Sequence, residues 1–212
     1  MYLALAAFLI LPTFVMFAQE PIVQRSTILV NTVKRGDVLR MVRGLGVLKT
    51  QRSAEIKIPE MYARPIEVGQ KATVDTGKGT VPARVARVAR VDETVVDGTV
   101  RVELQMDSDP PSGVSPGKSV DGTIVLLTLK DVMYVGGPTL SELEGRSETI
   151  FRLEPDGKQA SRVRVEYGLT GRSTGETRFD KVVEIRSGLK VGDTVILSDM
   201  SAFKGHDRVR LQ

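Results

Sequence analysis

Apolar and polar residues alternate along most of this 212-residue chain, and glycine, proline and aspartate interrupt the alternation at short intervals. Ala54, Ile56 and Ile58, for example, fall on one side of an expected strand, and the residues between them are charged. After residue 18, no long segment has the 3.6-residue period of an amphipathic helix. The sequence therefore predicts an all-β body made of short antiparallel strands.

Turn-forming residues divide the alternating sequence into short segments that we expect to form strands. They cover residues 27–33, 38–48, 54–58, 66–74, 81–91, 99–106, 120–129, 149–153 and 194–197. Pro110 and Pro111 keep the loop before residue 120 out of a central strand, and one short helical turn is expected over residues 59–64. The strands between residues 54 and 129 are joined by tight turns, which predicts a small antiparallel β-barrel.

The motif Lys-x-Gly-Asp occurs twice, at residues 34–37 and at residues 190–193. Both copies are expected to form turns next to strands. Each of these strands alone is too small to bury its apolar face, so it needs a partner. We therefore expect the strand over residues 27–33 and the run over residues 194–197 to fold into one β domain closed by both ends of the chain.

Residues 1–18 are almost entirely apolar and precede the first charged residue, Glu20. As a helix they would span about 27 Å, the lower limit for crossing a bilayer. We expect one hydrophobic helix that is either a membrane anchor or a signal segment cleaved after Ala18. Basic residues follow this segment and none precede it, so the positive-inside rule by itself would place the body in the cytoplasm.

The composition argues against most kinds of site chemistry. The chain has no cysteine, which excludes disulfides, thiol catalysis, zinc–thiolate sites and a lipidated cysteine. His206 is the only histidine, so no histidine pair is available for zinc. The formal net charge of +4 suits a protein near an anionic membrane, but it is too small to indicate nucleic-acid binding. We expect no enzyme activity, no metal and no cofactor.

Two charged patterns have a plain interpretation and a functional one. Arg84, Arg87 and Arg90 would form a basic strip on a helix, whereas a strand should divide them between two faces and leave a solvated surface. Asp107 and Asp109 have the alternate spacing of a calcium loop, but prolines follow where further ligands and a glycine are needed. The solvated strand and a plain turn are the favoured interpretations.

Ser198, Asp199 and His206 lie close together in the sequence and formally offer the side chains of a hydrolase. No Gly-x-Ser-x-Gly elbow surrounds the serine, which argues against a nucleophile. An envelope hydrolase is therefore a hypothesis to be excluded by substitution of His206.

Five stretches, in a fixed order, carry a resemblance to a known family. They lie at residues 32–46, 58–72, 116–124, 134–138 and, as a pair, 149–157 with 188–200. The last pair contains a strand, a Pro-Asp-Gly turn, and a buried run entered through a Gly-Asp turn. Together they resemble the HlyD-like periplasmic adaptors, or membrane fusion proteins, of tripartite efflux pumps, and are most similar to adaptors of macrolide-type ABC exporters.

The resemblance implies a membrane anchor or signal segment, a linker with the first membrane-proximal strands, a β-barrel domain and a C-terminal membrane-proximal β domain, over residues 1–18, 19–53, 54–130 and 131–212. In the family, a lipoyl domain and a long helical hairpin fill the place that only residues 49–53 occupy here. No heptad pattern elsewhere supplies a hairpin. Contact with an outer-membrane channel, which the hairpin tip makes in the family, is therefore doubtful.

By resemblance, the chain is a non-enzymatic adaptor subunit that couples an inner-membrane exporter, of ABC or RND type, to the outer-membrane channel. Such adaptors form homo-oligomeric rings, and the body would face the periplasm of a Gram-negative bacterium. The implied exporter contacts are Lys34, Arg35, Asp37, Arg40, Arg43, Lys190, Asp193 and Asp199. The competing hypothesis is a stand-alone envelope β-domain that binds or regulates without a transport role.

Overall fold

The computed structural model describes residues 20–89, 98–138, 140–175 and 177–212. The hydrophobic helix expected over residues 1–18 lies outside these ranges. Inside them, every helix is too short or too polar to cross a membrane. The described chain is mostly antiparallel β-sheet, as the alternating sequence predicted.

Thirteen strands and four short helical segments make up the described part of the chain. The strands are β1 (Ile22–Val23), β2 (Val30–Thr32), β3 (Lys34–Leu48), β4 (Ser53–Pro59), β5 (Lys71–Asp75), β6 (Thr80–Val88), β7 (Thr99–Met106), β8 (Ser119–Gly136), β9 (Ser147–Leu153), β10 (Gln159–Ser173), β11 (Val182–Ser187), β12 (Thr194–Ile196) and β13 (Arg208–Leu211). The helical segments are η1 (Arg25–Thr27), α1 (Glu60–Ala63), η3 (Leu140–Leu143) and η4 (Ser201–Phe203). The helical turn expected over residues 59–64 is confirmed by α1.

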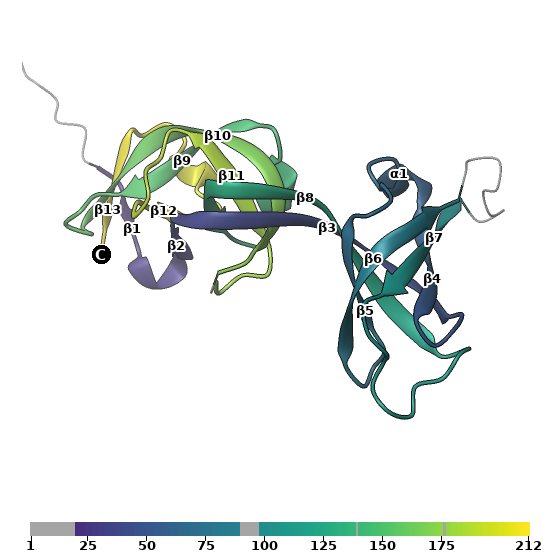
Figure 1. Cartoon of the computed structure of the whole chain (residues 1–212). Coiled ribbons are helices and arrows are strands. Elements are labelled where there is room, and N and C mark those ends of the chain that lie inside the picture. The colour runs from purple at the N-terminus through teal and green to yellow at the C-terminus, as the bar shows by residue number, and fades with distance from the viewer. Residues whose placement is uncertain (1–19, 90–97, 139, 176) are drawn as a thin grey trace, which may run out of the picture.

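Six strands form a barrel-like ring at the right of Figure 1. Each strand is paired antiparallel with two neighbours in the order β3-β4-β7-β6-β5-β8, and β8 pairs back with β3. Closure removes the free sheet edges that an open sheet would expose. The barrel was expected between residues 54 and 129. In the structure the ring also includes β3, which ends at Leu48, before that range begins.

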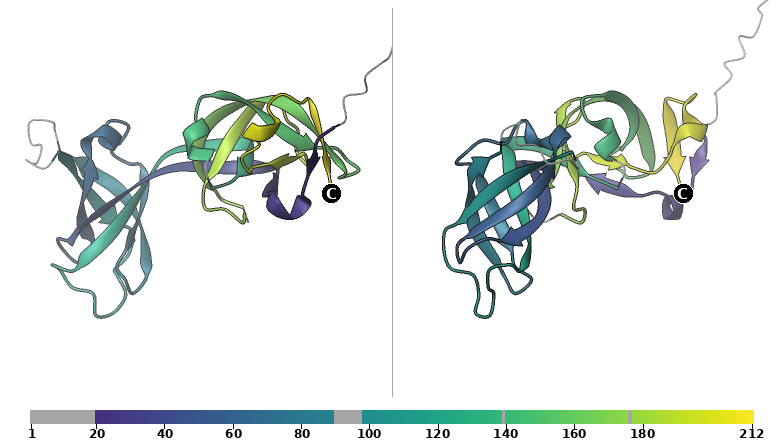
Figure 2. Two further views of the ribbon diagram at one scale, coloured as in Figure 1. Left: turned by 180° about the vertical axis from the view of Figure 1, so that it is seen from behind. Right: turned by 90° about the vertical axis from the view of Figure 1, so that its right-hand side faces the viewer.

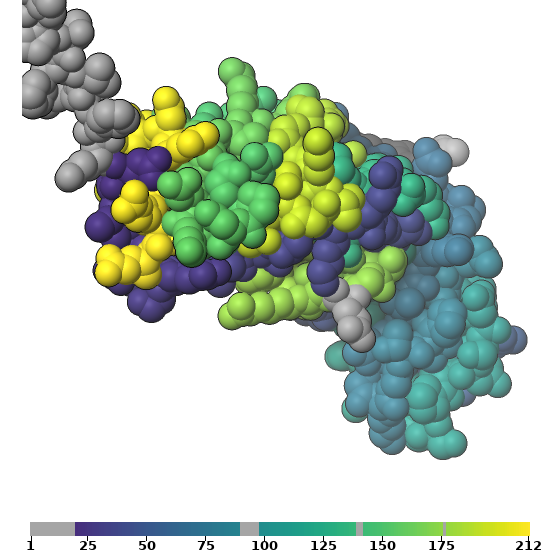
Figure 3. Space-filling model, turned by 90° about the vertical axis from the view of Figure 1, so that its left-hand side faces the viewer, coloured from purple at the N-terminus to yellow at the C-terminus, as the bar shows by residue number. Residues whose placement is uncertain are grey.

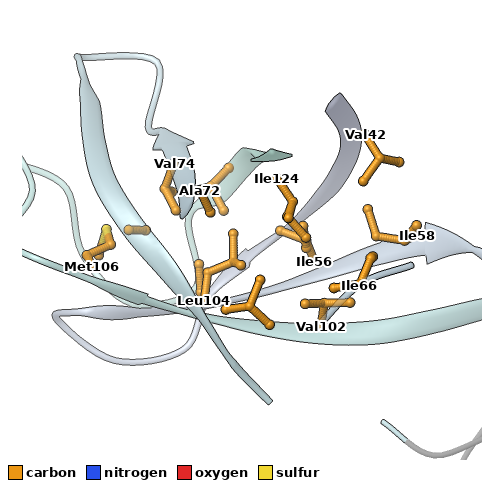
Figure 4. Packing of buried hydrophobic residues seen from close by; sticks show 14 of the residues in the cluster. Val42, Ile56, Ile58, Ile66, Ala72, Val74, Val102, Leu104, Met106 and Ile124 are labelled. Atoms are coloured by element: carbon orange, nitrogen blue, oxygen red, sulfur yellow. The ribbon is translucent and has the colours of Figure 1, made fainter. Parts of the chain in front are cut away.

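Apolar side chains of the ring point inward and form one core. Ala54, Ile56 and Ile58 of β4 are all fully buried, as their alternation predicted. Figure 4 shows Ile56 and Ile124 pointing toward one another from β4 and β8. Valine, leucine and isoleucine supply most of this core, because β-branched and aliphatic side chains suit the inner face of a pleated sheet.

Glycines allow β3 to approach β4 closely where the ring closes. A Cβ atom added at Gly46 would lie 1.9 Å from the carbonyl oxygen of Glu55 and 2.6 Å from Cα of Ile56. A Cβ atom at Gly44 would lie 2.4 Å from the carbonyl oxygen of Lys57. These are backbone atoms, so they cannot move aside without disturbing the β-ladder.

The remaining strands form a second β domain at the left of Figure 1. Its main sheet runs in the order β8-β11-β10-β9-β12-β2, and β10 also pairs with β13, which pairs in parallel with β1. Figure 3 views the end of this domain, where the first described residues (purple) and the C-terminal residues (yellow) share one face.

Both ends of the chain contribute to the core of this C-terminal domain. β2 pairs antiparallel with β12, with Asn31 opposite Val195. Val33 and Val195 belong to the same buried cluster, and both are almost fully inaccessible to solvent. The prediction that the early strand and the run at residues 194–197 fold together is therefore confirmed, although β2 is shorter than the strand expected over residues 27–33.

β3 and β8 run through both domains. They pair with each other from Lys34 opposite Tyr134, in the C-terminal domain, to Val47 opposite Ser119, in the barrel. Figures 1 and 2 show the two domains side by side and joined by these two strands, which we call the connecting ribbon. The ribbon fixes where the barrel lies relative to the C-terminal domain.

The turn expected at residues 34–37 is wrong. β3 begins at Lys34 and continues without a break through this motif. At Asp37 the ribbon has a β-bulge, in which Lys130 and Asp131 of β8 lie opposite a single residue of β3. The motif is extended here because its backbone is paired with β8.

The second copy of the motif does form a turn, as predicted. Gly192 has φ +93°, in the left-handed region that glycine tolerates best. The amide of Asp193 donates a hydrogen bond to the carbonyl of Lys190 over 3.1 Å. The same four-residue pattern therefore has two conformations, and the neighbouring strands decide between them.

The expectation that a strand divides Arg84 and Arg87 between two faces is also wrong. β6 contains an irregularity between Val85 and Arg87, and this extra residue shifts the alternation by one. Arg84 and Arg87 are both exposed as a result. Arg90 lies outside the described residues.

Candidate functional site

The residues expected to contact an exporter lie in three places. Lys34, Arg35, Asp37, Arg40 and Arg43 are spread along β3, from the C-terminal domain to the barrel. The other expected residues lie in the turn before β12, at Lys190 and Asp193, and in the loop after it, at Asp199. The fold brings the first two places together only at the start of β3.

The start of β3 lies against the turn that precedes β12. The amide of Val33 donates to the carbonyl of Asp193 over 2.8 Å, and the amide of Gly192 donates to the carbonyl of Val33 over 3.0 Å. Lys34 and Lys190 are both exposed beside this pairing. The carboxylate of Asp193 is half-buried, and it accepts the amide of Lys190 over 2.9 Å.

Val191 adds an apolar element to this surface, since it is 53% exposed between Lys190 and the turn glycine. Val191 is thus an exposed aliphatic side chain next to a charged one on the same turn. We call Lys34, Lys190 and Val191 the turn surface.

The bulge at Asp37 is held by charged side chains. The Asp37 carboxylate accepts hydrogen bonds from Nζ of Lys130 over 2.5 Å and from the amide of Asp131 over 3.1 Å. The pKa of Asp37 is lowered, first by the Lys130 hydrogen bond and then by the Asp131 amide. Asp131 has φ 51° and pairs through its carboxylate with Nε of Arg35 over 3.0 Å. Arg35 and Asp37 therefore serve the geometry of the ribbon.

Arg40 reaches from the ribbon to the C-terminal domain. Its Nη1 atom lies 2.7 Å from Oε1 of Glu144. The other carboxylate oxygen of Glu144 accepts the hydroxyl of Thr170 over 2.5 Å and its amide over 3.3 Å. Burial raises the pKa of Glu144, but the hydrogen bonds from Thr170 and the charge of Arg40 outweigh it, so the net shift is downward.

Arg43 forms an ion pair within the barrel wall. Its Nη2 atom lies 2.5 Å from Oδ2 of Asp121, on the neighbouring strand β8. The arginine side chain is 71% exposed, so the pair is largely solvated. Arg35, Asp37, Arg40 and Arg43 thus each have an ion-pair partner inside the chain, and Lys34 also has an interaction within it.

The side chains of the suggested hydrolase have separate structural roles. The hydroxyl oxygen of Ser198 accepts the amide of Leu29 over 2.6 Å, which ties the loop after β12 to the N-terminal segment. The Asp199 carboxylate accepts the amide of Ser201 over 2.8 Å, and this hydrogen bond lowers the pKa of Asp199. Among the described residues, no hydrogen bond joins Ser198 to His206.

A hollow of about 320 Å³ lies beside Asp199, lined by residues of β9, β10, β12 and η4. Its walls mix apolar side chains, such as Ile150 and Met200, with charges of both signs, such as Arg162 and Glu148. Nη1 of Arg162 donates to the carbonyl of Lys204 over 2.6 Å, so this charge is partly used in the wall itself. The mixed lining of the hollow does not indicate any one class of ligand.

The described residues hold no cluster of three or more potential metal ligands. The carboxylates of the suggested calcium loop lie near arginines instead. Asp107 is 3.9 Å from Nε of Arg84, and Asp109 is 3.4 Å from Nε of Arg52. Each of these two carboxylates thus has an arginine as its neighbour.

Sequence reasoning missed Glu144 and Thr170. Glu144 contacts Arg40 from 104 residues away along the chain, and Thr170 contacts Glu144 from 26 residues away. No motif surrounds either residue, so only the fold reveals the contact. Asp131 was missed for the same reason.

No protein-family model matches the chain, and no curated protein matches it. Solved structures do match it. MacA from Actinobacillus actinomycetemcomitans has 18% identity and a TM-score of 0.49, over 69% of this chain and 42% of that chain. ZneB from Cupriavidus metallidurans has 20% identity and a TM-score of 0.30, over 70% of this chain and 40% of that chain.

The chain spans about two fifths of the length of either of these proteins. The similarity extends over about 70% of the present chain. The described residues contain no helical hairpin, and β3 is joined to β4 through residues 49–52 alone.

Proposed function

We propose that this protein is an adaptor subunit of an efflux transporter, with its body in the periplasm and its C-terminal domain next to the inner membrane. The partner is an inner-membrane exporter of ABC or RND type, and the subunits assemble as a homo-oligomeric ring. Residues 1–18 attach the chain to the membrane in this proposal. The five ordered sequence stretches support the assignment to this class of protein.

The observation that carries the proposal is the connecting ribbon. β3 and β8 each extend as one strand from one apolar core to the other and pair with each other except at two β-bulges, so a displacement of the C-terminal domain reaches the barrel through the backbone of these two strands. Transmission of movement requires no catalytic group. This arrangement supports a mechanical coupler better than it supports an enzyme.

The turn surface is the candidate exporter contact. Lys34, Lys190 and Val191 are exposed on the C-terminal domain, where β3 begins beside the turn at residues 190–193. Val33 and Val195, which come from the two ends of the chain, pack in one core behind this surface and hold it in place. A rigid turn loses little conformational entropy on binding.

The connection between β3 and β4 limits how far the protein reaches. Residues 49–52 form a tight turn in which the carbonyl of Ser53 accepts the amide of Lys49 over 2.8 Å. Four residues span at most about 14 Å, so they cannot form a long hairpin. We propose that the described chain does not recruit an outer-membrane channel by itself. A lipoyl segment and hairpin grafted between Thr50 and Gln51 should enable recruitment, because the two strands leave the barrel side by side.

Co-purification tests the proposal. The tagged full-length chain is co-expressed with a macrolide-type ABC exporter or with an RND exporter, and the detergent-solubilised complex is isolated. Lys190→Glu should weaken binding, while the matched reversal Lys71→Glu, on an exposed position of the barrel strand β5, should leave it unchanged. Failure to bind either exporter would favour the stand-alone binding protein. Equal binding by both variants would move the contact away from the turn surface.

A further inference from the structure

Strand β9 has one edge that the sheet leaves partly open. All of β9, from Ser147 to Leu153, pairs with β10 in continuous antiparallel register. On its other side, β12 pairs with β9 at Arg152 alone. No other strand in the described ranges pairs on that side, so residues 147–150 form an open stretch of sheet, which we call the free edge. A free edge presents backbone groups with which another extended chain pairs readily.

The backbone of Thr149 points out of the free edge. In an antiparallel ladder, residues that exchange hydrogen bonds with one neighbour alternate with residues whose amide and carbonyl face the other way. At one end of the ladder, the amide of Glu154 donates to the carbonyl of Gln159 on the β10 side. Counting back in steps of two, Ile150 also bonds to β10, whereas the amide and carbonyl of Thr149 face away from it. Among the described residues, neither of these two groups has a hydrogen-bond partner.

The hollow beside Asp199 lies along the free edge. Thr149 and Ile150 line it on one side, and Ile196 and Met200 line it on the other. Ile150 and Met200 pack against two different apolar clusters of the C-terminal domain, so the hollow opens between them. A cavity of about 150 Å³ is enough to hold benzene. The hollow, at about 320 Å³, therefore has room for an apolar side chain.

Basic side chains predominate on the face of the free edge to which Thr149 belongs. Arg164 of β10 lies opposite Thr149 in the ladder and is exposed. Arg162 and Lys204 line the hollow. Asp199 lines it too, but its carboxylate already accepts a backbone amide of η4 over 2.8 Å. This face therefore favours acidic side chains on a ligand.

The opposite face of the free edge is mainly apolar, because successive side chains of a strand alternate between faces. Ile150 and Leu143 pack against the same apolar cluster, and both line the hollow. Glu148 also belongs to this face, at the open end of the edge. A strand paired with the free edge thus places an apolar side chain over Ile150 and acidic side chains on the basic face.

We propose that the free edge binds an extended segment of a partner protein as an added β-strand. Backbone hydrogen bonds to Thr149 supply the pairing, and alternate side chains decide which segments bind. A peptide presents apolar and charged groups together, which suits the mixed lining of the hollow. Four residues of edge span about 14 Å, so the segment is short. The inference does not rest on the proposed function, because the free edge is present with or without an exporter.

Binding of defined peptides to the full chain tests the proposal. The probe is a fluorescein-labelled Glu-Val-Glu-Val-Glu-Val peptide, and fluorescence anisotropy measures its affinity. A block peptide, Glu-Glu-Glu-Val-Val-Val, has the same composition without the alternation and should bind at least several times more weakly. Two further probes are N-methylated on the valines or on the glutamates. Successive amides of a strand point to opposite edges, so one methylated probe should lose binding and the other should keep it.

Thr149→Pro removes the amide at the free edge and places a ring in the path of the added strand. Because this amide has no acceptor within the described chain, the fold should tolerate the change, which circular dichroism checks. The affinity for the alternating peptide should fall by about tenfold. Thr149→Val keeps the amide and should leave the affinity unchanged. Lys204→Glu should weaken binding severalfold, whereas the matched reversal Lys158→Glu, exposed on the turn between β9 and β10, should not.

Amide hydrogen exchange places the peptide on the molecule. The amide of Thr149 should gain protection when the alternating peptide binds. If Thr149→Pro does not fold, the two methylated peptides decide the outcome, since both are compared on the parent chain. Equal binding of the alternating and block peptides, unchanged exchange at Thr149, or no saturable binding at millimolar peptide would overturn the proposal.

Discussion

Replacing Gly46 with alanine should open the barrel where β3 meets β4. The new Cβ atom would lie 1.9 Å from the carbonyl oxygen of Glu55. Ordinary van der Waals contact of a Cβ atom begins at 3.4 Å, so the two strands must separate by roughly 1.5 Å. The carbonyl oxygen of Glu55 and the Cα atom of Ile56, which is 2.6 Å away, both belong to the backbone, so no rotamer change can relieve these contacts.

The separation has a cost that can be estimated. Overpacking a well-packed site costs about 1–3 kcal/mol, and each ladder hydrogen bond lost adds about 1 kcal/mol. We therefore expect Gly46→Ala to lower the free energy of unfolding by about 3–4 kcal/mol. In a chain of this size the midpoint of thermal unfolding should fall by about 10 °C.

Circular dichroism with thermal and urea unfolding measures this effect. Gly205→Ala is the matched control, because a Cβ atom at Gly205 meets no atom within 4 Å and the residue has no left-handed φ. That variant should be neutral or stabilised by about 0.4–1 kcal/mol. A loss below about 0.5 kcal/mol for Gly46→Ala would refute the argument that close approach of β3 and β4 requires glycine.

Three further outcomes follow from the buried contacts. Burial, with a smaller contribution from Glu148, raises the pKa of Tyr167 to about 12 from 10.0. The neutral phenol therefore contributes roughly 3 kcal/mol to the free energy of unfolding, which is fully present below pH 10 and is lost as the pH rises through about 12. A tyrosinate absorbance titration of the parent and of Tyr167→Phe should show this late ionisation only in the parent. Truncation after Gly188 removes β12 and β13, so the amide of Val33 should lose its protection from hydrogen exchange; retained protection would contradict the shared core. Ser198→Ala removes the acceptor of the Leu29 amide, and stability should fall by about 1–2 kcal/mol, as measured by urea unfolding, while a purely catalytic serine would leave it unchanged.

Strand alternation was enough to predict that the chain is mostly antiparallel β-sheet. Ala54, Ile56 and Ile58 are buried because a period of two places them all on the inner face of β4. Tight turns with glycine, such as residues 190–193, were also predicted correctly. These features depend on residues that are close in sequence.

Bulges and long-range ion pairs were beyond the reach of the sequence. The motif at residues 34–37 reads as a turn, yet pairing with β8 extends it, and the bulge there depends on Asp131 far along the chain. The extra residue after Val85 likewise places Arg84 and Arg87 together on the exposed surface. The partners of Arg40 were unpredictable because a local pattern carries no information on which strand will lie next to it.

Binding of the full-length chain to an inner-membrane exporter tests the central claim most directly. The tagged chain is purified from membranes that contain a macrolide-type ABC exporter, an RND exporter and an outer-membrane channel, and the bound proteins are quantified. The account predicts that one exporter is retained with the chain, that Lys190→Glu reduces its amount, and that the channel is absent until a hairpin is grafted between Thr50 and Gln51. Retention of the channel by the unmodified chain, or absence of both exporters at high expression, would contradict it.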